Sequence, residues 1–213
     1  MELLKKEKQI KNKRYSLIIF LGIFLLLLGI SYNIYNHYQQ KKQDSVDNEK
    51  VEEFFEIKEE KDSDEEVSVE TPTLKEETNN YIGVLEILKI NLKKGIVDKT
   101  SASNNVNKNI YTLRETTLPD EQINSHIILA GHSGNSYVSF FRNLKKLDMK
   151  DKVYFYYKGV KYIYEVSNKY EIEKTGTTEL KQTNISDITL ITCISGTNKQ
   201  VVYVATLIDQ ENY

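Results

Sequence analysis

An uncharged apolar run near the amino terminus constrains the fold of this chain more than any other feature. Residues 15–35, YSLIIFLGIFLLLLGISYNIY, contain no charged side chain, and six Lys and Arg residues in segment 5–14 precede them. About 20 helical residues span the hydrocarbon core of a bilayer, and tyrosines favour its edges. A cleaved signal peptide has the same order of charges, but no small-x-small cleavage site follows the run. We therefore expect a retained transmembrane helix over 15–35, a cytoplasmic basic tail over 1–14, and an extracellular remainder.

Acidic side chains dominate the next segment, residues 36–79. Within it, residues 44–78 hold fifteen Asp and Glu against four Lys, and no Gly. Such a segment repels itself and buries too little apolar surface to form a core, so we expect a largely disordered linker. A second interpretation is a short amphipathic helix marked by Phe54, Phe55 and Ile57.

From about residue 80 the chain changes to short β-branched and aromatic runs separated by turn residues. The clearest six of the expected strands cover residues 81–87, 126–131, 153–157, 161–166, 188–193 and 200–208. Lys158 and Gly159 form the expected hairpin turn, and residues 136–147 carry a weak helical spacing. The pattern predicts an all-β domain over 80–213 with seven or eight strands and one or two short helices. A closed or nearly closed barrel is favoured, with a sandwich as the alternative.

Charge and cysteine content exclude several function classes. The net charge of −2 averages a basic start, an acidic middle and a nearly balanced remainder, and no concentrated basic face suggests nucleic-acid binding. Cys193 is the only cysteine, so no intramolecular disulfide forms, and no Cys/His cluster has the spacing of a metal site.

Cys193 and His132 form the candidate catalytic pair. His132 follows the apolar run at 126–131 and lies between Gly131 and Gly134, and Cys193 ends the run at 188–193. A free thiol is mostly protonated at neutral pH and needs a nearby imidazolium or other cation to form the thiolate. Two strands of one sheet can bring such residues together. The alternative for Cys193 is an inert apolar residue in the core.

These motifs resemble those of sortases, the membrane-anchored cysteine transpeptidases that attach proteins to Gram-positive cell walls. ITLITC resembles the TLxTC signature, ILAGHSG the histidine loop, and IGVLEILKINLKKGIV the opening strands. His before Cys is also the sortase order. The resemblance covers about residues 80–210, is class A- or D-like rather than class B or C, and implies a closed eight-stranded barrel behind a single membrane helix.

The resemblance implies a role for each motif residue. Cys193 would attack the Thr–Gly carbonyl of an LPxTG-like sorting signal to form a thioacyl enzyme, and His132 would protonate the departing amine. An amine from a peptidoglycan precursor or a pilin would then resolve the intermediate at the extracellular face of the cell membrane. Thr192 is similar to a substrate-contacting threonine of the family, although it is equally an ordinary strand residue. No cofactor is implied.

The chain departs from the family at the arginine that usually follows the cysteine loop. No arginine lies beyond Cys193, and Gln200 occupies the equivalent position with Lys199 adjacent. Gln can donate one amide N–H to an oxyanion but lacks the charged guanidinium of arginine, whereas Lys199 should point to the opposite face of the strand. A β-bulge that shifts the register by one residue would exchange the directions of Gln200 and Lys199. This departure favours one alternative function, a catalytically weak, membrane-tethered module that binds sorting signals.

Acidic groups bind calcium in some relatives, and Glu171 and Glu173 occupy a comparable segment. Two glutamates are an ordinary surface feature, so we assign no metal site to them.

Overall fold

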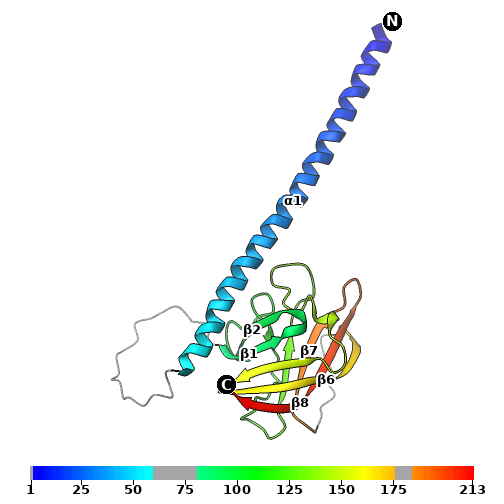
Figure 1. The fold of residues 1–213 in the computed structure, drawn as a ribbon. Helices are drawn as coiled ribbons and strands as arrows, with labels where there is room; N and C mark the ends of the chain where they lie inside the picture. Colours follow the sequence, from blue (N-terminus) through cyan, green and yellow to red (C-terminus); the bar gives the residue numbers. More distant parts are fainter. Residues whose placement is uncertain (1, 60–80, 176–183) are drawn as a thin grey trace. The chain divides into compact units, whose positions relative to one another are not determined.

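The computed structural model describes residues 2–59, 81–175 and 184–213 (Figure 1). The chain divides into two compact units, Met1–Lys42 and Gln43–Tyr213. Residues 60–79 of the expected linker lie outside the described residues.

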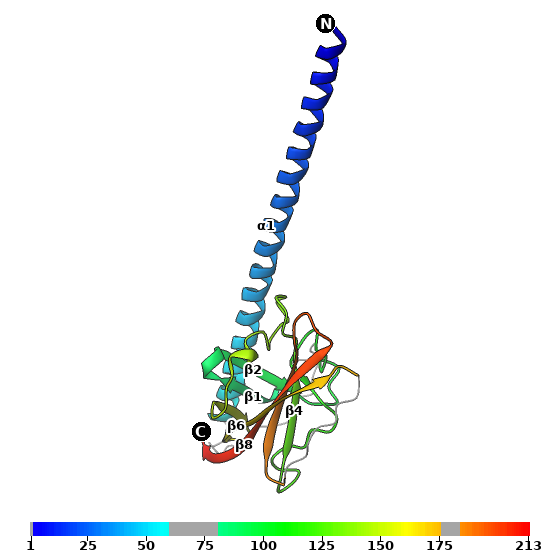
Figure 2. The same cartoon turned by 90° about the vertical axis from the view of Figure 1, so that its right-hand side faces the viewer.

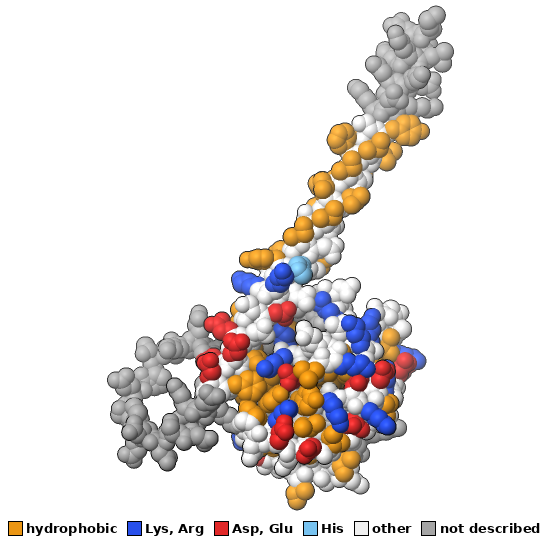
Figure 3. Space-filling model, viewed as in Figure 1, with side chains coloured by type: hydrophobic (Ala, Val, Ile, Leu, Met, Phe, Trp, Pro, Cys, Tyr) orange, Lys and Arg blue, Asp and Glu red, His pale blue; other side chains and the backbone are white. Residues whose placement is uncertain are grey.

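Helix α1, Glu2–Glu59, contains the apolar run found in the sequence. An 18-residue window in Tyr15–Glu56 has a mean hydropathy of 2.5, and none of it is buried. Figure 3 shows these apolar side chains exposed along the helix. By length and composition, α1 can cross a membrane.

Beyond the apolar run, α1 continues through residues 36–59. The structure differs here from the expected linker, because the helix shows no break after residue 35. No Gly or Pro occurs between Ile30 and Thr71, and Glu, Lys and Gln are all good helix formers. Local propensity therefore outweighs the mutual repulsion of the acidic side chains in this part.

The last turns of α1 pack on the barrel within the second unit. Val51 is 2% exposed, and Asp47 lies buried beside Lys94, with 2.7 Å between Oδ2 and Nζ. Asp44 also accepts a hydrogen bond from the Lys94 ammonium, at 2.9 Å. The Tyr81 hydroxyl donates to the other oxygen of Asp47, and burial followed by this carboxylate raises the pKa of Tyr81. Hydrogen bonds from Lys94 and Tyr81 compensate the buried Asp47 carboxylate for the loss of its hydration.

An aromatic contact continues this interface toward the end of α1. The ring of Phe55 makes edge-to-face contacts with Tyr156 and Tyr213, with centroids 5.2 and 5.3 Å apart. Such pairs add to the stability gained from burial of the rings. The amphipathic-helix interpretation of Phe54 and Phe55 thus describes this segment better than a solvated spacer does.

Eight strands form one sheet that curls on itself (Figures 1 and 2). The elements are β1 Tyr81–Ile87, 3-10 helix η1 Leu88–Ile90, β2 Leu92–Val97, β3 Tyr111–Thr112, β4 His126–Ala130, 3-10 helix η2 Leu144–Lys146, β5 Lys152–Tyr157, β6 Val160–Glu173, β7 Asp187–Cys193 and β8 Lys199–Asn212. Their order in the sheet is β2-β1-β5-β6-β8-β7-β4-β3. The strand ladder does not join the edge strands, but the Thr112 hydroxyl donates to the Val97 carbonyl across the gap, at 2.9 Å. The expected all-β, eight-stranded barrel is confirmed, and it is nearly closed.

The β5–β6 hairpin has the expected turn. Lys158 and Gly159 have φ of 43° and 87°, the left-handed values that suit the two central residues of a tight hairpin. In β5, alternate side chains are buried, namely Val153, Phe155 and Tyr157. The period of two follows from the pleat of the strand and directs these residues into the barrel.

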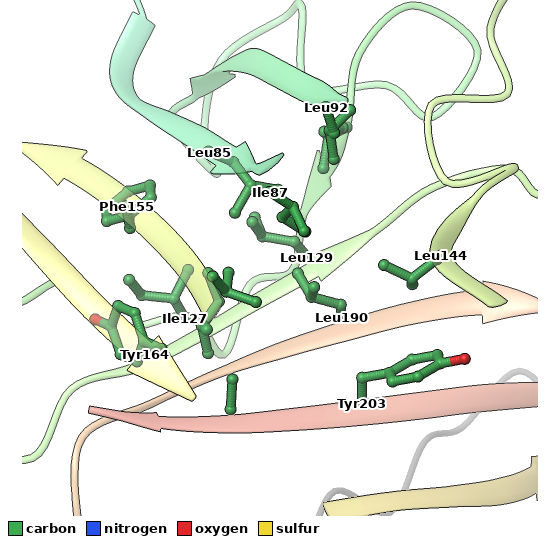
Figure 4. Packing of buried hydrophobic residues seen from close by; sticks show 14 of the residues in the cluster. Leu85, Ile87, Leu92, Ile127, Leu129, Leu144, Phe155, Tyr164, Leu190 and Tyr203 are labelled. Atoms are coloured by element: carbon green, nitrogen blue, oxygen red, sulfur yellow. The ribbon is translucent and has the colours of Figure 1, made fainter. Parts of the chain in front are cut away.

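The barrel interior is filled by large apolar side chains from every long strand (Figure 4). Leu85, Leu129, Phe155, Leu190 and Tyr203 are each at most 1% exposed and belong to one cluster, the barrel core.

Segment 131–147 supplies three further side chains to the barrel core, Phe141, Leu144 and Leu147. We expected a helix over residues 136–147, but the structure has turns and only the short η2. The three-residue spacing of the buried positions matches the period of a 3-10 helix, which rarely extends beyond one turn.

The packing of α1 on the barrel gives a stability prediction. In the full chain in detergent micelles, Asp47→Ala leaves Lys94 buried with one exposed partner, so the free energy of unfolding falls by about 3 kcal/mol. Denaturant unfolding followed by tyrosine fluorescence measures this change. The control is Glu211→Ala, which removes an exposed partner of Lys161 and costs less than about 1 kcal/mol. Equal stabilities for the two variants would contradict the packing of this helix segment on the barrel.

Candidate active site

One parallel strand pair determines where the candidate residues lie. β4 pairs with β7 in parallel, in a register that matches Ile127 with Ile188 and Ala130 with Ile191. The carboxyl ends of parallel strands meet at the same edge of a sheet. Two residues beyond this last pair the chain reaches His132 after β4 and Cys193 at the end of β7. The register that pairs Ala130 with Ile191 therefore brings positions 132 and 193 opposite each other.

Three hydrogen bonds extend this pairing beyond the end of β4. The Gly131 amide donates to the Ile191 carbonyl at 3.1 Å, and the Thr192 hydroxyl donates to the Gly131 carbonyl at 2.7 Å. The Ser133 hydroxyl donates to the Cys193 carbonyl at 2.6 Å. These bonds fix the backbone on both sides of His132 against the strand that carries the thiol.

Alternation along β7 decides which way the thiol points. Leu190 belongs to the barrel core, whereas Ile191 belongs to a second cluster on the outer face of the sheet. We call this second group the outer cluster: Ile128, Ile191, Val202 and Val204, with Leu113, Ala130, Tyr170 and Ile172 packed against it. Cys193 is two residues after Ile191 and so lies on the outer face, where it is half-buried. The thiol is therefore not part of the barrel core.

The side chain of Thr192 points to the opposite face of β7 from the Cys193 thiol. It is 3% exposed, lies on the same side of β7 as Leu190, and its hydroxyl is bonded to Gly131. The resemblance implied a substrate contact for this side chain, but the structure shows it buried and holding the histidine loop.

Gln200, and not Lys199, lies on the same face as the thiol. Gln200 is the direct partner of Cys193 in the β7–β8 ladder, and cross-strand partners project to one side of a sheet. Lys199 alternates to the other side, where its ammonium lies 3.3 Å from a carboxylate oxygen of Glu171. Gln200 and Lys199 thus point to opposite faces of the sheet, as expected. The β7–β8 ladder has no bulge that would exchange their directions.

The histidine loop is anchored at several points. The Phe141 amide donates to the His132 carbonyl at 3.0 Å, and the Arg142 guanidinium donates to the Ser136 and Ser139 carbonyls. The His132 ring is half-buried, with 3.0 Å between its Nε2 and Oδ1 of Asn107.

Sequence reasoning did not identify Asn107 or Ser133 as site residues. Ser133 is adjacent to His132, and Asn107 lies in the asparagine-rich stretch SNNVNKN at 103–109. That stretch is the one signal in the sequence that could have pointed to Asn107, because clustered asparagines are typical of a loop whose side chains hydrogen-bond to its own backbone.

The other histidine of the barrel domain lies outside this arrangement. His126 is at the start of β4, at the opposite end of the strand pair, where its Nδ1 is 2.6 Å from the fully buried Asp187 carboxylate. In residues 2–59, 81–175 and 184–213, no group of three or more His, Cys, Asp and Glu side chains is placed to hold a metal ion.

The two glycines beside His132 give a matched pair of predictions. A Cβ on Gly131 would lie 2.9 Å from the ring of the buried Phe141, whereas on Gly134 it would make only an ordinary 3.4 Å contact with Ser139. Gly131→Ala should therefore lower the free energy of unfolding by about 1–3 kcal/mol through overpacking. Gly134→Ala should change it by less than about 0.5 kcal/mol. Thermal unfolding of both variants measures the difference, and equal melting temperatures would refute the close packing at Gly131.

Comparison with known proteins agrees with this architecture. A family model described as the sortase domain matches residues 85–208. The chain is 25% identical over 203 residues to sortase A of Bacillus anthracis, an alignment covering 91% of this chain and 93% of that protein.

Solved structures of sortases have the same fold. Sortase A of Listeria monocytogenes gives a TM-score of 0.53 at 24% identity, covering 62% of this chain and 90% of that one. Sortase C1 of Streptococcus suis gives 0.54 at 26% identity, covering 62% and 74%. Because the sortase model matches more than half of the chain, this protein belongs to the sortase family of transpeptidases.

Proposed function

We propose that this sortase cleaves an LPxTG-like sorting signal through a thioacyl intermediate on Cys193 and transfers the protein to an amine. The observation that supports the proposal is the β4–β7 register, from which we infer that positions 132 and 193, two residues beyond its last pair, are neighbours. A thiolate and an imidazolium at such neighbouring positions stabilise each other, and the thiolate is the nucleophilic form.

The reaction follows from these two groups. The Cys193 sulfur forms a bond to the scissile carbonyl carbon, and the electron pair of the C=O bond moves to oxygen. When the oxyanion collapses, the C–N bond breaks and the His132 imidazolium gives its proton to the departing amine. A second amine then attacks the thioacyl carbon, its proton passes to His132, and the thiolate leaves. The products are a new amide and the resting enzyme.

Gln200 is the proposed donor to the oxyanion. Its side chain projects from the position directly opposite Cys193, and an amide N–H can stabilise negative charge on a carbonyl oxygen. The sequence has no arginine beyond Cys193 that could supply a charged fork.

The partly buried side chains at the edge of the outer cluster, and not its buried members, support a peptide substrate with apolar side chains. Ile172 is half-buried, pairs with Gln200 in the β6–β8 ladder and packs on the cluster. Apolar surface beside the thiol favours residues such as the Leu and Pro of a sorting signal.

We also propose that α1 anchors the enzyme in the cell membrane by residues 15–35. The six basic residues of segment 5–14 favour a cytoplasmic amino terminus, which leaves the barrel outside the cell. Sorting signals of secreted proteins and the amines of peptidoglycan precursors or pilins are accessible on that side.

Peptide turnover tests the proposal. Reduced wild-type protein in detergent micelles should cleave at least one member of an LPxTG-type peptide library, and added triglycine should divert the acyl product from free acid to amide. Mass spectrometry identifies the scissile bond and both products. Cys193→Ala should form no covalent adduct and give no turnover, because the nucleophile is absent.

Two results would contradict the transpeptidase. If the wild-type protein forms no adduct with any library member, the thioacyl mechanism is wrong. Peptide binding that survives Cys193→Ser, without turnover in either protein, would identify the sorting-signal binding module instead.

The role of Gln200 gives a separate prediction. Gln200→Ala should lower kcat by about a hundredfold, because loss of an oxyanion donor costs roughly that factor. Lys199→Ala should change kcat by less than about twofold, since Lys199 is paired with Glu171 on the other face. Steady-state kinetics with the library peptide measures both. A larger loss for Lys199→Ala than for Gln200→Ala would reassign the donor.

A further inference from the structure

The segment between β2 and β3 is an asparagine-rich loop that holds its own shape. Asn104 Nδ2 donates to the carbonyls of Lys99 and Thr112, and its Oδ1 accepts from the Thr112 amide at 2.8 Å. Asn109 is 8% exposed and donates to the Ser103 carbonyl at 2.9 Å. These side-chain amides replace a regular strand ladder and tie both ends of the loop to its base.

Asn107 lies in this loop, on a stretch of backbone that hydrogen bonds from its neighbours hold in place. Its amide N–H donates to Asn105 Oδ1 at 2.8 Å, and the next two amides, of Lys108 and Asn109, donate to the Asn105 carbonyl. Gln43 of α1, in the same compact unit, donates from Nε2 to the Lys108 carbonyl at 3.2 Å. Asn107 therefore has a defined position, although its side chain is exposed.

Unlike those of Asn104, Asn105 and Asn109, the side chain of Asn107 reaches outside the loop. Its Oδ1 is 3.0 Å from Nε2 of His132. A side-chain carbonyl oxygen only accepts hydrogen bonds, so Nε2 must carry the proton in this contact. The other ring nitrogen, Nδ1, is then the one left to exchange a proton.

We propose that Asn107 is a positioning residue that orients the His132 imidazole and assigns the acid–base step to Nδ1. The inference rests on the proposed function of Cys193 and His132. In the cycle, Nδ1–H of the imidazolium gives its proton to the departing amine and Nδ1 later takes one from the incoming amine. The Nε2–H proton stays in the hydrogen bond to Asn107 throughout, so no net proton is gained or lost at that atom.

The resting protein tests the orientation without any substrate. In full-length protein labelled with ¹⁵N-histidine in detergent micelles, the His132 ring should show an Nε2–H cross peak protected from exchange with water. Asn107→Ala should lose this cross peak, and Asn107→Asp, which keeps an acceptor oxygen, should retain it. Lys108→Ala is the matched control, because it changes an exposed side chain of the same loop and leaves Asn107 in place. An Nδ1–H tautomer in the wild-type protein, or a cross peak that persists in Asn107→Ala, would overturn the proposal.

Kinetics then separates positioning from folding. With a cleaved LPxTG-type peptide, Asn107→Ala should lower kcat by about three- to tenfold, the usual effect of one neutral hydrogen bond, with KM and the melting temperature unchanged. Asn107→Asp should restore most of kcat, and Lys108→Ala should match the wild type. Equal kcat values for Asn107→Ala and Lys108→Ala would refute a positioning role. Absence of turnover in the wild type would instead refute the proposed function and leave the spectroscopic result standing.

Discussion

The parallel pairing of β4 with β7 is the constraint on which the candidate site depends. In an otherwise antiparallel ladder of described strands, it is the one pair whose carboxyl ends meet at the same edge. Continued by two residues beyond Ala130 and Ile191, this register would bring two positions that are 61 residues apart in the chain to within one strand spacing, about 4.8 Å. Thr192 and Ser133 strengthen it beyond the last regular pair, since each donates a hydrogen bond to a backbone carbonyl of the other segment. A shift of one residue in this register would turn the thiol toward the barrel core.

The two loops at the candidate site are each tied to a different part of the fold. Phe141 anchors the histidine loop in the barrel core, and asparagine side chains close the loop before β3 on itself. The end of α1 packs on β1 and β2 through the buried pair of Asp47 and Lys94 and contacts the asparagine loop through Gln43. Side chains held from several directions would lose less orientational freedom in a reaction, which favours catalysis by positioned groups.

The sequence patterns predicted the long strands and a candidate pair, Cys193 and His132, but not the contacts that cross between segments. Period-two alternation and turn residues identify the long strands, since both signals are local. The direction of Thr192 depends on the tertiary pairing of β7. The residue facing His132, Asn107, comes from a loop 25 positions earlier that has no periodic pattern. The acidic composition predicted a solvated segment around Asp47. Composition alone does not reveal that Lys94 and Tyr81 donate hydrogen bonds to that carboxylate.

Cross-linking measures the central contact most directly. In-register neighbours on parallel strands have Cα atoms about 4.8 Å apart, within the range that a disulfide spans. His132→Cys should therefore form an intramolecular disulfide with Cys193 on mild oxidation, detected by mass spectrometry as a linked pair of peptides that reduction separates. Gly134→Cys, two residues farther along the loop, should leave both thiols free. If His132→Cys stays fully reduced under conditions that oxidise exposed dithiols, positions 132 and 193 are not neighbours and the proposed active site is wrong.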